Sequence, residues 1–564
     1  MTDTKNEHIR EICQKLRPIL GARADTIWFA YLREDESGKK EIESLLEIYS
    51  SQLLQGNLQE DKKLLIPPSK EKAAGEYYIG DAIYDGKLLF PFGLKEEEWI
   101  RHINIFGQSG AGKTNLSFLI MRELARKKKP FLFLDWKRNG KDLMTRPEFE
   151  DLLVFTVGRN ISPFRFNPLI PPPDADPKAW LKKLIEVIAH AYCLGNGVIY
   201  LLQQAIDDAY KKYGIYTGNA TKYPTFRDIH EWLKNYPAQG RETNWLTSAM
   251  RATASLCFGS MDSVVNSGQN YGMEEILKQK VILELDALTQ SDKIFFIESL
   301  ILWIHDYRLT RPERENFSHC IICEEAHHIL SGERHSLFGG ESVIIVAIKE
   351  LRELNQSFVV VDQMPSQISP VAMANSYCTI AMNLKNKQDV SSAASAMLLD
   401  NEQKEYLGKL EVGEAIVKLQ GRILSPFMIH IPEFPIQKGS VDDTFIKRRM
   451  KTYFSNFQPQ LVEGSENESI EVQDKASEPA NTLSEREKQF LLDVFNYPRS
   501  GTVERYNRMH ISCRQGDKIK RCLLAKGLFL QEDLPTQNGR LRIIRLTDQT
   551  RKLLENQEKS ISEL

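Results

Sequence analysis

Eight consecutive residues have the pattern of a phosphate-binding loop: Gly107, Gln108, Ser109, Gly110, Ala111, Gly112, Lys113 and Thr114. They follow a short apolar run and precede a segment with helical spacing of leucines. Glycines let backbone N–H groups turn toward a phosphate, and the following helix N-terminus adds partial positive charge. The lysine can reach the β- and γ-phosphates, and the threonine hydroxyl can bind Mg²⁺. We therefore expect these residues, with Asn115 after them, to bind ATP and Mg²⁺.

Two adjacent carboxylates, Glu324 and Glu325, follow an apolar run at 320–323. The carboxyl ends of strands are where ligands bind in open α/β sheets. Hydrolysis needs one carboxylate beside Mg²⁺ and another that takes a proton from the attacking water. We assign the first role to Glu324 and the second to Glu325. The alternative, two glutamates on a helix surface, fits poorly with the apolar run before them.

Another apolar run ends at Asp362 and Gln363. The Gln363 amide could orient the attacking water or sense the γ-phosphate, or it could be a polar cap at the end of a strand. Transition-state charge on the phosphates also has to be neutralised, a task that suits arginine. The candidates, which the residue pattern alone does not rank, are Lys349, Arg352, Arg422 and Arg138.

Continuously apolar runs predict the strands that position these residues. They lie at 131–135, 152–155, 281–285, 320–323 and 358–361, and the runs at 377–383 and 415–419 extend the set. Strands without polar alternation are typical of a parallel sheet that is buried on both faces. Helical segments lie between several of them, so we predict an α/β fold with a mainly parallel sheet.

The chain divides by composition and periodicity into four parts. Residues 1–75 are predicted to be a helical N-terminal region. Residues 76–435 are the α/β core, which a helical insertion at 176–278 interrupts. Residues 436–483 are an extension and an acidic flexible linker. Residues 484–564 are predicted to form a winged helix, with three helices and a hairpin that turns at Asn538 and Gly539.

Basic residues concentrate in this last part: Arg505, Arg508, Arg514, Lys518, Lys520, Arg521, Lys526, Arg540, Arg542 and Arg545. They would suit contacts with DNA phosphates. A winged helix that docks a protein through an ordinary solvated face is an equal alternative.

Bulk composition argues against several classes of protein. The chain has 564 residues, 27% of them charged, and a net charge of −2, so any DNA contact has to be local. The apolar runs are too short to span a bilayer and the first residues are polar, which favours a cytoplasmic protein without a membrane segment. The eight cysteines are scattered. We expect Cys320 and Cys323 to be buried thiols in a strand and not a metal pair.

An ordered set of motifs resembles the HerA/FtsK superfamily of P-loop ATPases, and most closely the HerA branch. The motifs, spread over residues 77–435, are HINIFG at 102–107, FLDWK at 133–137, FNPL at 166–169, EEAH at 324–327, ELREL at 350–354, DQMPS at 362–366 and LEVGEA at 410–415. The resemblance implies a RecA-like core, a hexameric ring with ATP hydrolysed between subunits, and duplex DNA pumped through the pore. It also implies that Arg352 reaches the neighbouring subunit, with Arg422 as second choice. Gln363 matches the family's strand-end glutamine.

The chain departs from that family in three places. Glu324 stands where many relatives carry aspartate, so Mg²⁺ could be held through water. The HerA N-terminal β-barrel is not evident, because residues 7–58 have helical spacing. The predicted winged helix is more similar to the end of FtsK, while the lack of a membrane segment disfavours membrane-anchored FtsK and conjugation coupling proteins.

These features lead to a functional hypothesis. The chain is predicted to be a hexameric ATP-driven motor that translocates double-stranded DNA, in DNA processing or anti-phage defence. No nuclease constellation is recognisable in the sequence, so a separate nuclease or effector would cut the DNA. One alternative is a regulatory ATPase ring that controls a partner effector. Another is a winged-helix DNA-binding regulator with an ATPase switch.

Overall fold

The computed structural model describes most of the chain in two compact units, Met1–Val462 and Glu463–Leu564. The described residues are 2–53, 65–268, 270, 272–312, 317–331, 342–456, 485–498, 500–512, 516, 519–520, 523, 528–536, 539–547 and 550–551. The predicted linker at 457–483 lies outside them.

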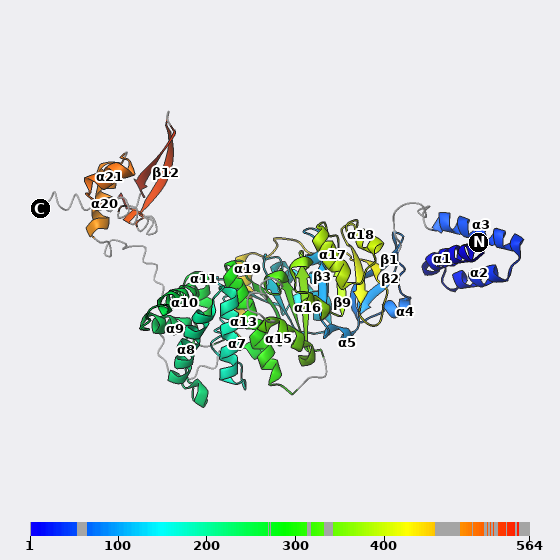
Figure 1. Cartoon of the computed structure of the whole chain (residues 1–564), viewed down its shortest axis with the longest axis horizontal. Helices are drawn as coiled ribbons and strands as arrows, with labels where there is room; N and C mark the ends of the chain where they lie inside the picture. The colour runs from blue at the N-terminus through cyan, green and yellow to red at the C-terminus, as the bar shows by residue number, and fades with distance from the viewer. Residues whose placement is uncertain are drawn as a thin grey trace. The chain divides into compact units, whose positions relative to one another are not determined.

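One sheet of eleven strands forms the centre of the first unit (Figure 1). In chain order its strands are β1 (Tyr77–Tyr84), β2 (Lys87–Leu94), β3 (Ile103–Phe106), β4 (Phe131–Asp135), β5 (Leu153–Thr156), β6 (Lys280–Glu284), β7 (His319–Glu324), β8 (Gln356–Asp362), β9 (Cys378–Ala381), β10 (Glu414–Leu419) and β11 (Phe427–His430). Their order across the sheet is β2-β1-β11-β10-β9-β3-β8-β7-β4-β6-β5. The seven strands from β9 to β5 run parallel, and the other four pair antiparallel. The predicted mainly parallel sheet is therefore confirmed.

Helices fill the ranges between the strands. The first are α1 (Thr2–Leu20), α2 (Ala22–Arg33), α3 (Glu36–Leu53), α4 (Lys70–Ala73), α5 (Glu96–Trp99) and α6 (Lys113–Arg126). The range predicted for the helical insertion holds α7 (Pro177–Ala191), α8 (Asn196–Lys212), α9 (Phe226–Lys234), α10 (Glu242–Leu256), α11 (Gly259–Val265) and α12 (Met273–Ile276). Then follow α13 (Gln290–Leu309), α15 (Val343–Leu351), α16 (Pro370–Ala374), α17 (Lys387–Ala396), α18 (Asn401–Tyr406) and α19 (Asp443–Asn456).

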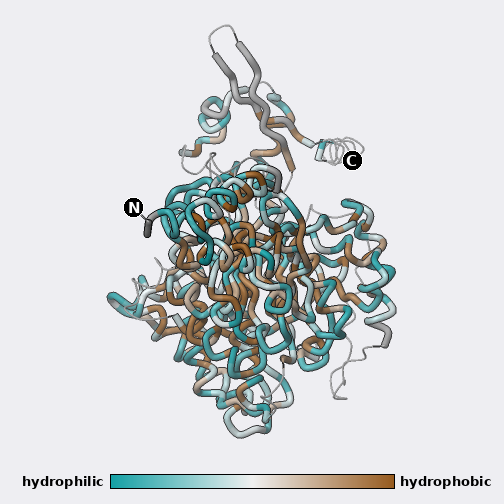
Figure 2. The backbone as a smooth tube through the Cα atoms, turned by 90° about the vertical axis from the view of Figure 1, so that its right-hand side faces the viewer, coloured by the Kyte–Doolittle hydropathy of each residue, from teal (hydrophilic) through white to brown (hydrophobic). Residues whose placement is uncertain are grey.

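The hydrophobic core lies around the central strands, and hydrophobic segments gather there in Figure 2. All residues of β3, β4, β7 and β8 are buried, as their continuously apolar sequences predict. Residues 294–304 of helix α13 are buried on all sides, and all of them except Glu298 and Ser299 are apolar. It packs against α7 and α15. Cys320 and Cys323 are buried free thiols, as predicted.

The N-terminal helices form a small cluster of their own on the β1–β2 hairpin. Their apolar faces pack together with Tyr84 and Leu89 of the hairpin. The Tyr84 hydroxyl also donates a hydrogen bond to the Lys15 carbonyl. The described part of residues 7–58 is helical, so a helical module occupies this end of the first unit, in agreement with the sequence pattern. Among the described residues, no helix combines the length and the apolar character needed to cross a membrane.

The second unit contains α20 (Glu485–Asn496), α21 (Thr502–Arg508) and a hairpin of β12 (Phe529–Thr536) and β13 (Gly539–Leu546). The third helix expected near 518–526 falls largely outside the described residues, so the winged helix stays a prediction. Arg505 was expected among the phosphate contacts, but it is fully buried and pairs with Asp493 at 2.8 Å. Arg508 pairs with the same carboxylate at 2.9 Å. Arg505 therefore stabilises this unit's interior.

Arg422 joins distant parts of the first unit. Its guanidinium donates to both carboxylate oxygens of Glu98, at 2.8 and 3.0 Å. It also donates to the carbonyls of Lys72, Ala74 and Gly93 at 2.6 to 2.7 Å. Its donors are thus used within the subunit, beside the β1–β2 hairpin. Our second choice for an arginine that reaches a neighbour is wrong, because Glu98 is buried and needs this partner.

We expect Arg422→Met to lower the free energy of unfolding of the first unit by about 3 kcal/mol, because it leaves the buried Glu98 carboxylate without its cation. Urea unfolding followed by tryptophan fluorescence would measure this loss. Turnover per folded molecule should be unchanged. The matched control is Arg227→Met, which breaks an exposed pair with Asp262 and should cost about 1 kcal/mol or less. Lost turnover with unchanged stability would contradict the structural role.

Candidate nucleotide site

The phosphate-binding loop connects β3 to α6. Gly110 and Gly112 have φ angles of +83° and +111°, a conformation that other L-residues rarely adopt. A side chain at Gly107 would place its Cβ 2.9 Å from the Cβ of Met382. The loop is fastened to both neighbouring strands, because the Gly107 N–H donates to the Asp362 carbonyl and the Gln108 N–H to the Asn383 carbonyl. The positive φ angles at Gly110 and Gly112 and the close approach at Gly107 explain why glycine is required at three positions of the loop.

Lys113 begins α6 and turns back over the loop. Its Nζ donates to the carbonyls of Gly107 and Gln108, at 2.6 and 3.0 Å. Burial lowers the pKa of this ammonium, and the nearby Glu325 carboxylate works against that shift. To contact a phosphate, Lys113 has to exchange the two carbonyls for phosphate oxygens.

Thr114 and Glu324 form a pair that suits a divalent cation. The Thr114 hydroxyl donates to Oε1 of Glu324 at 3.3 Å. The Glu324 side chain is buried, and its Oε2 has no hydrogen-bond partner among the described residues. Burial, together with the charge of Asp135, raises the pKa of Glu324 to about 8. A cation here would compensate the buried carboxylate, and hydroxyl and carboxylate oxygens are ligands that Mg²⁺ accepts, so the predicted Mg²⁺ site fits these residues.

Glu325 follows β7 and Gln363 follows β8, but their side chains are in direct contact. The Gln363 Nε2 donates to both carboxylate oxygens of Glu325, at 2.8 and 3.0 Å. Lys137 Nζ lies 2.5 Å from Oε1 of the same carboxylate. Burial alone would raise the pKa of Glu325, but these hydrogen bonds outweigh it and leave the pKa below its usual value. Glu325 also has a φ of +50°, which is unusual for a residue with a side chain and often marks functional sites.

Asp362 orders the turns that carry these two residues. Its carboxylate accepts the backbone N–H groups of His327 and Met364, each at 2.7 Å. The His327 ring Nδ1 lies 2.9 Å from the same carboxylate. Burial opposes a charged imidazole, but Asp362 outweighs burial and raises the pKa of His327. Asp362 therefore fixes the positions of Glu325 and Gln363 relative to each other.

Asn115 and Arg138 have other partners. The Asn115 amide donates to the Pro432 carbonyl at 2.9 Å and accepts the Phe434 N–H at 2.7 Å, so it tethers the segment after β11 to the start of α6. Arg138 pairs with Asp443 at 2.6 Å and lies 3.5 Å from the buried Glu284. Its guanidinium is engaged beside the ends of β4 and β6. Lys349 lies on α15.

Arg352 lies far from the loop of its own chain. It is exposed and follows α15 in a short 3-10 turn, Arg352–Leu354, just before β8 begins. Asp362, which contacts the loop, is at the other end of that strand. Seven residues of strand span about 20 Å. Arg352 thus cannot complete the site that its own Lys113 belongs to.

Lys137 was missed as a site residue. It belongs to the FLDWK motif, to which we assigned no role. The signal available in the sequence was a lysine directly after a buried strand that ends in aspartate.

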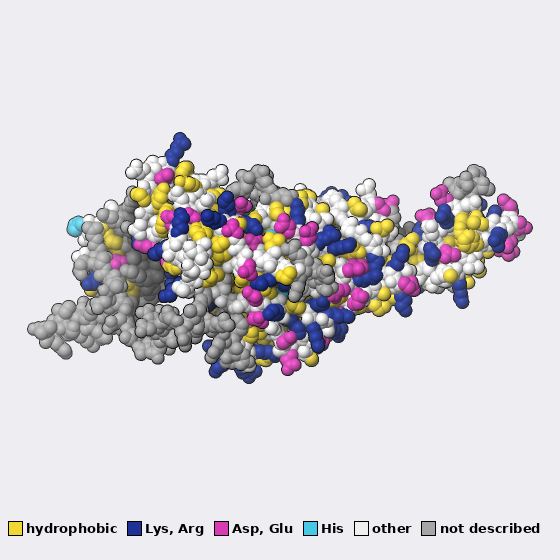
Figure 3. Space-filling model, turned by 90° about the horizontal axis from the view of Figure 1, so that it is seen from below, with side chains coloured by type: hydrophobic (Ala, Val, Ile, Leu, Met, Phe, Trp, Pro, Cys, Tyr) yellow, Lys and Arg dark blue, Asp and Glu magenta, His cyan; other side chains and the backbone are white. Residues whose placement is uncertain are grey.

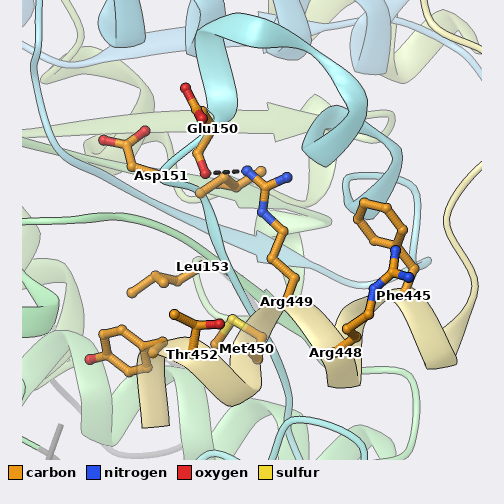
Figure 4. A pocket seen from close by; sticks show the side chains of 10 residues that line it. Glu150, Asp151, Leu153, Phe445, Arg448, Arg449, Met450 and Thr452 are labelled. Atoms are coloured by element: carbon orange, nitrogen blue, oxygen red, sulfur yellow. Dashed lines mark hydrogen bonds between the residues drawn. The ribbon is translucent and has the colours of Figure 1, made fainter. Parts of the chain in front are cut away.

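A hollow of about 630 Å³ lies between α19 and edge strand β5 (Figure 4). There Arg449 donates to the carbonyls of Met144, Phe149 and Glu150. Strands β8, β7, β4 and β6 separate this hollow from the loop after β3, so it is not part of the nucleotide site.

Comparisons with known proteins give one family match and several similar solved structures. The family model described as "Helicase HerA, central domain" matches residues 77–168, which contain the loop. Similar solved structures include VirB4 of Thermoanaerobacter pseudethanolicus, with 14% identity, a TM-score of 0.49, and coverage of 64% of this chain and 97% of that one. The plasmid coupling protein TrwB, solved with ADP and Mg²⁺, has 10% identity, a TM-score of 0.48, and coverage of 62% and 89%.

The genome packaging NTPase B204 of Sulfolobus turreted icosahedral virus 2 has 10% identity, a TM-score of 0.29, and coverage of 59% of this chain and 98% of that one. No curated protein sequence matches the chain. The matched family model includes the phosphate-binding loop, and the carboxylates and the glutamine that the motifs predicted lie beside that loop. The predicted resemblance is confirmed over residues 77–168, which match the HerA central domain and contain the phosphate-binding loop of a P-loop ATPase.

Proposed function

We propose that this ATPase is a ring-forming motor, expected to be a hexamer, that moves double-stranded DNA. The observation that carries the proposal is the position of Arg352. An arginine supplied by a neighbour often completes a phosphoryl-transfer site, and Arg352 is exposed at the opposite edge of the sheet from its own loop. In a ring, Arg352 of one subunit can face the loop of the next. The matched family is a helicase domain, which supports DNA as the substrate.

The residues of the site have distinct roles in the proposed hydrolysis. The loop N–H groups and Lys113 hold the β- and γ-phosphates. Thr114 and Glu324 would hold Mg²⁺, which neutralises charge on the phosphate oxygens when bound. Glu325 accepts a proton from the attacking water, and the Gln363 amide fixes the orientation of Glu325 and of that water. Arg352 from the neighbour stabilises the charge that develops during transfer.

DNA contact would depend on local charge. Lys and Arg side chains alternate with Asp and Glu over the face shown in Figure 3. This mixed face agrees with the net charge of −2, so contacts with DNA would have to be local. Cutting of the DNA would be done by a separate nuclease or effector, in DNA processing or defence against phage.

A second candidate is a regulatory ring in which DNA movement is secondary. The module α1–α3 favours it, because several large apolar residues of α2 and α3 are exposed: Phe29, Leu32, Leu45 and Ile48. Exposed apolar groups that lie near one another often mark protein contacts. A partner effector bound to this module could be controlled by the ATPase without being fed DNA.

The DNA test measures the ATPase rate with and without linear duplex DNA, on protein whose oligomeric state is determined in parallel. We expect a hexamer whose rate rises several-fold with DNA, with Lys113→Ala as the inactive control. A hexamer whose ATPase rate does not change with DNA but rises with a protein partner would support the regulatory ring instead. A dimer that binds a specific DNA sequence would support a DNA-binding regulator with an ATPase switch.

We expect Glu325→Gln to bind ATP with Mg²⁺ but to lower turnover by a factor of about 100 or more, because the amide cannot accept the proton. Fluorescent-nucleotide binding and phosphate release would measure the two properties separately. The control is Glu231→Gln on the exposed side of α9, which should retain the normal rate. Turnover close to normal in Glu325→Gln would remove Glu325 from the role of base.

Arg352→Ala should keep ATP binding and lose turnover, because the missing guanidinium belongs to the neighbour's site. Mixing it with Lys113→Ala subunits should restore part of the activity. In mixed rings, an intact loop from the first variant meets an intact Arg352 from the second. Phosphate release at varied mixing ratios would measure the recovery. No recovery at any ratio, with mixed rings verified, would contradict action across the interface.

A further inference from the structure

Lys137 is held in a defined position beside the proposed base. It follows β4, and the pairing of Leu134 with Cys323 places it next to the end of β7. The buried Asp135 carboxylate accepts the N–H groups of Lys137 and Gly140, at 2.9 and 2.7 Å, which fixes the turn. The Lys137 side chain is 54% exposed, whereas that of Glu325 is 12% exposed. The ammonium can therefore leave the pair without unfolding its turn.

Two donors already occupy Oε1 of Glu325. They are Lys137 Nζ at 2.5 Å and Gln363 Nε2 at 2.8 Å. A carboxylate oxygen has two lone-pair sites, so Oε1 has none left for a water proton. As long as Lys137 holds Oε1, only Oε2, which also accepts Gln363 Nε2 at 3.0 Å, is left for a water proton.

A γ-phosphate would compete with Glu325 for this ammonium. Lys113, which lies over the phosphate-binding loop, is close to this pair, because both the Glu325 carboxylate and the Lys137 ammonium influence its pKa. Because the lysine side of this ion pair is half exposed, water can solvate the departing ammonium, so the exchange costs little. The flexible four-carbon stem of lysine lets the charge move between two acceptors. ADP lacks a γ-phosphate and therefore cannot compete with Glu325 in this way.

We propose that Lys137 is a positioning residue shared between Glu325 and the γ-phosphate: a bound triphosphate draws its ammonium away, and Glu325 becomes free to accept the water proton. The inference rests on the proposed role of Glu325 as the base. It deepens that role, because the same exchange couples recognition of the triphosphate to release of the base. Lys137 acts through Glu325 and does not take the proton itself.

The test compares affinities for a non-hydrolysable ATP analogue and for ADP, both with Mg²⁺ and without DNA. We expect Lys137→Met to weaken binding of the analogue about tenfold and to leave ADP binding unchanged, because a charge-assisted contact with the γ-phosphate is lost. Lys137→Arg should recover part of the loss. Glu325→Gln should strengthen binding of the analogue several-fold, because the competing carboxylate is gone. That gain should vanish in the double variant Lys137→Met, Glu325→Gln.

The control is Lys278→Met, which removes a lysine from an exposed pair with Glu275 and should change neither affinity. An equal loss of ADP and analogue binding in Lys137→Met would overturn the proposal and leave Lys137 a structural role. A gain from Glu325→Gln that persists without Lys137 would overturn it too, and Glu325→Gln alone tests it if Lys137→Met does not fold. These affinities are measured without DNA, so their failure is distinct from failure of DNA to stimulate hydrolysis.

Discussion

The parallel register of β3, β8 and β7 is the constraint on which the rest of the site depends. Phe106 at the end of β3 pairs with Asp362, and Glu324 at the end of β7 pairs with Val361. Three segments far apart in the sequence therefore end at the same edge. A shift of one residue in either pairing would turn Glu324 or Asp362 to the other face of the sheet. Main-chain hydrogen bonds between the strands therefore bring the loop, the cation ligands and the turn of Gln363 together at one edge of the sheet.

That register also concentrates buried negative charge. Asp135 and Glu324 end neighbouring strands, and both are buried. Burial of a carboxylate is costly unless it is hydrogen-bonded or paired with a cation. Asp135 is compensated by backbone N–H groups of its own turn, whereas Glu324 keeps an unpartnered oxygen. The difference separates a carboxylate that shapes a turn from one that is suited to a metal ion.

Local patterns were enough to predict the loop, the apolar strands and the strand-end positions of Glu324, Glu325 and Gln363, because each depends on neighbours in sequence. Side-chain partners were not predictable. Arg422 pairs with Glu98, which is 324 positions away in the chain, and Arg505 pairs with Asp493 inside the second unit. Nothing in the residue type distinguishes an arginine that will be buried from one that will face a neighbour. The position of Lys137 after a strand that ends in aspartate was visible in the sequence, but its pairing with Glu325, which follows another strand, was not.

Strand β8 links the two ends of the proposed mechanism. It begins just after Arg352, which would serve the neighbour's nucleotide, and ends at Asp362, which orders Glu325 and Gln363 in its own subunit. This seven-residue strand is fully buried and hydrogen-bonded on both sides, so it is a stiff connection between the two ends. Movement of Arg352 toward a neighbour's phosphates would therefore shift the turn that positions the base. In a ring, this connection would let hydrolysis in one subunit influence the readiness of the next.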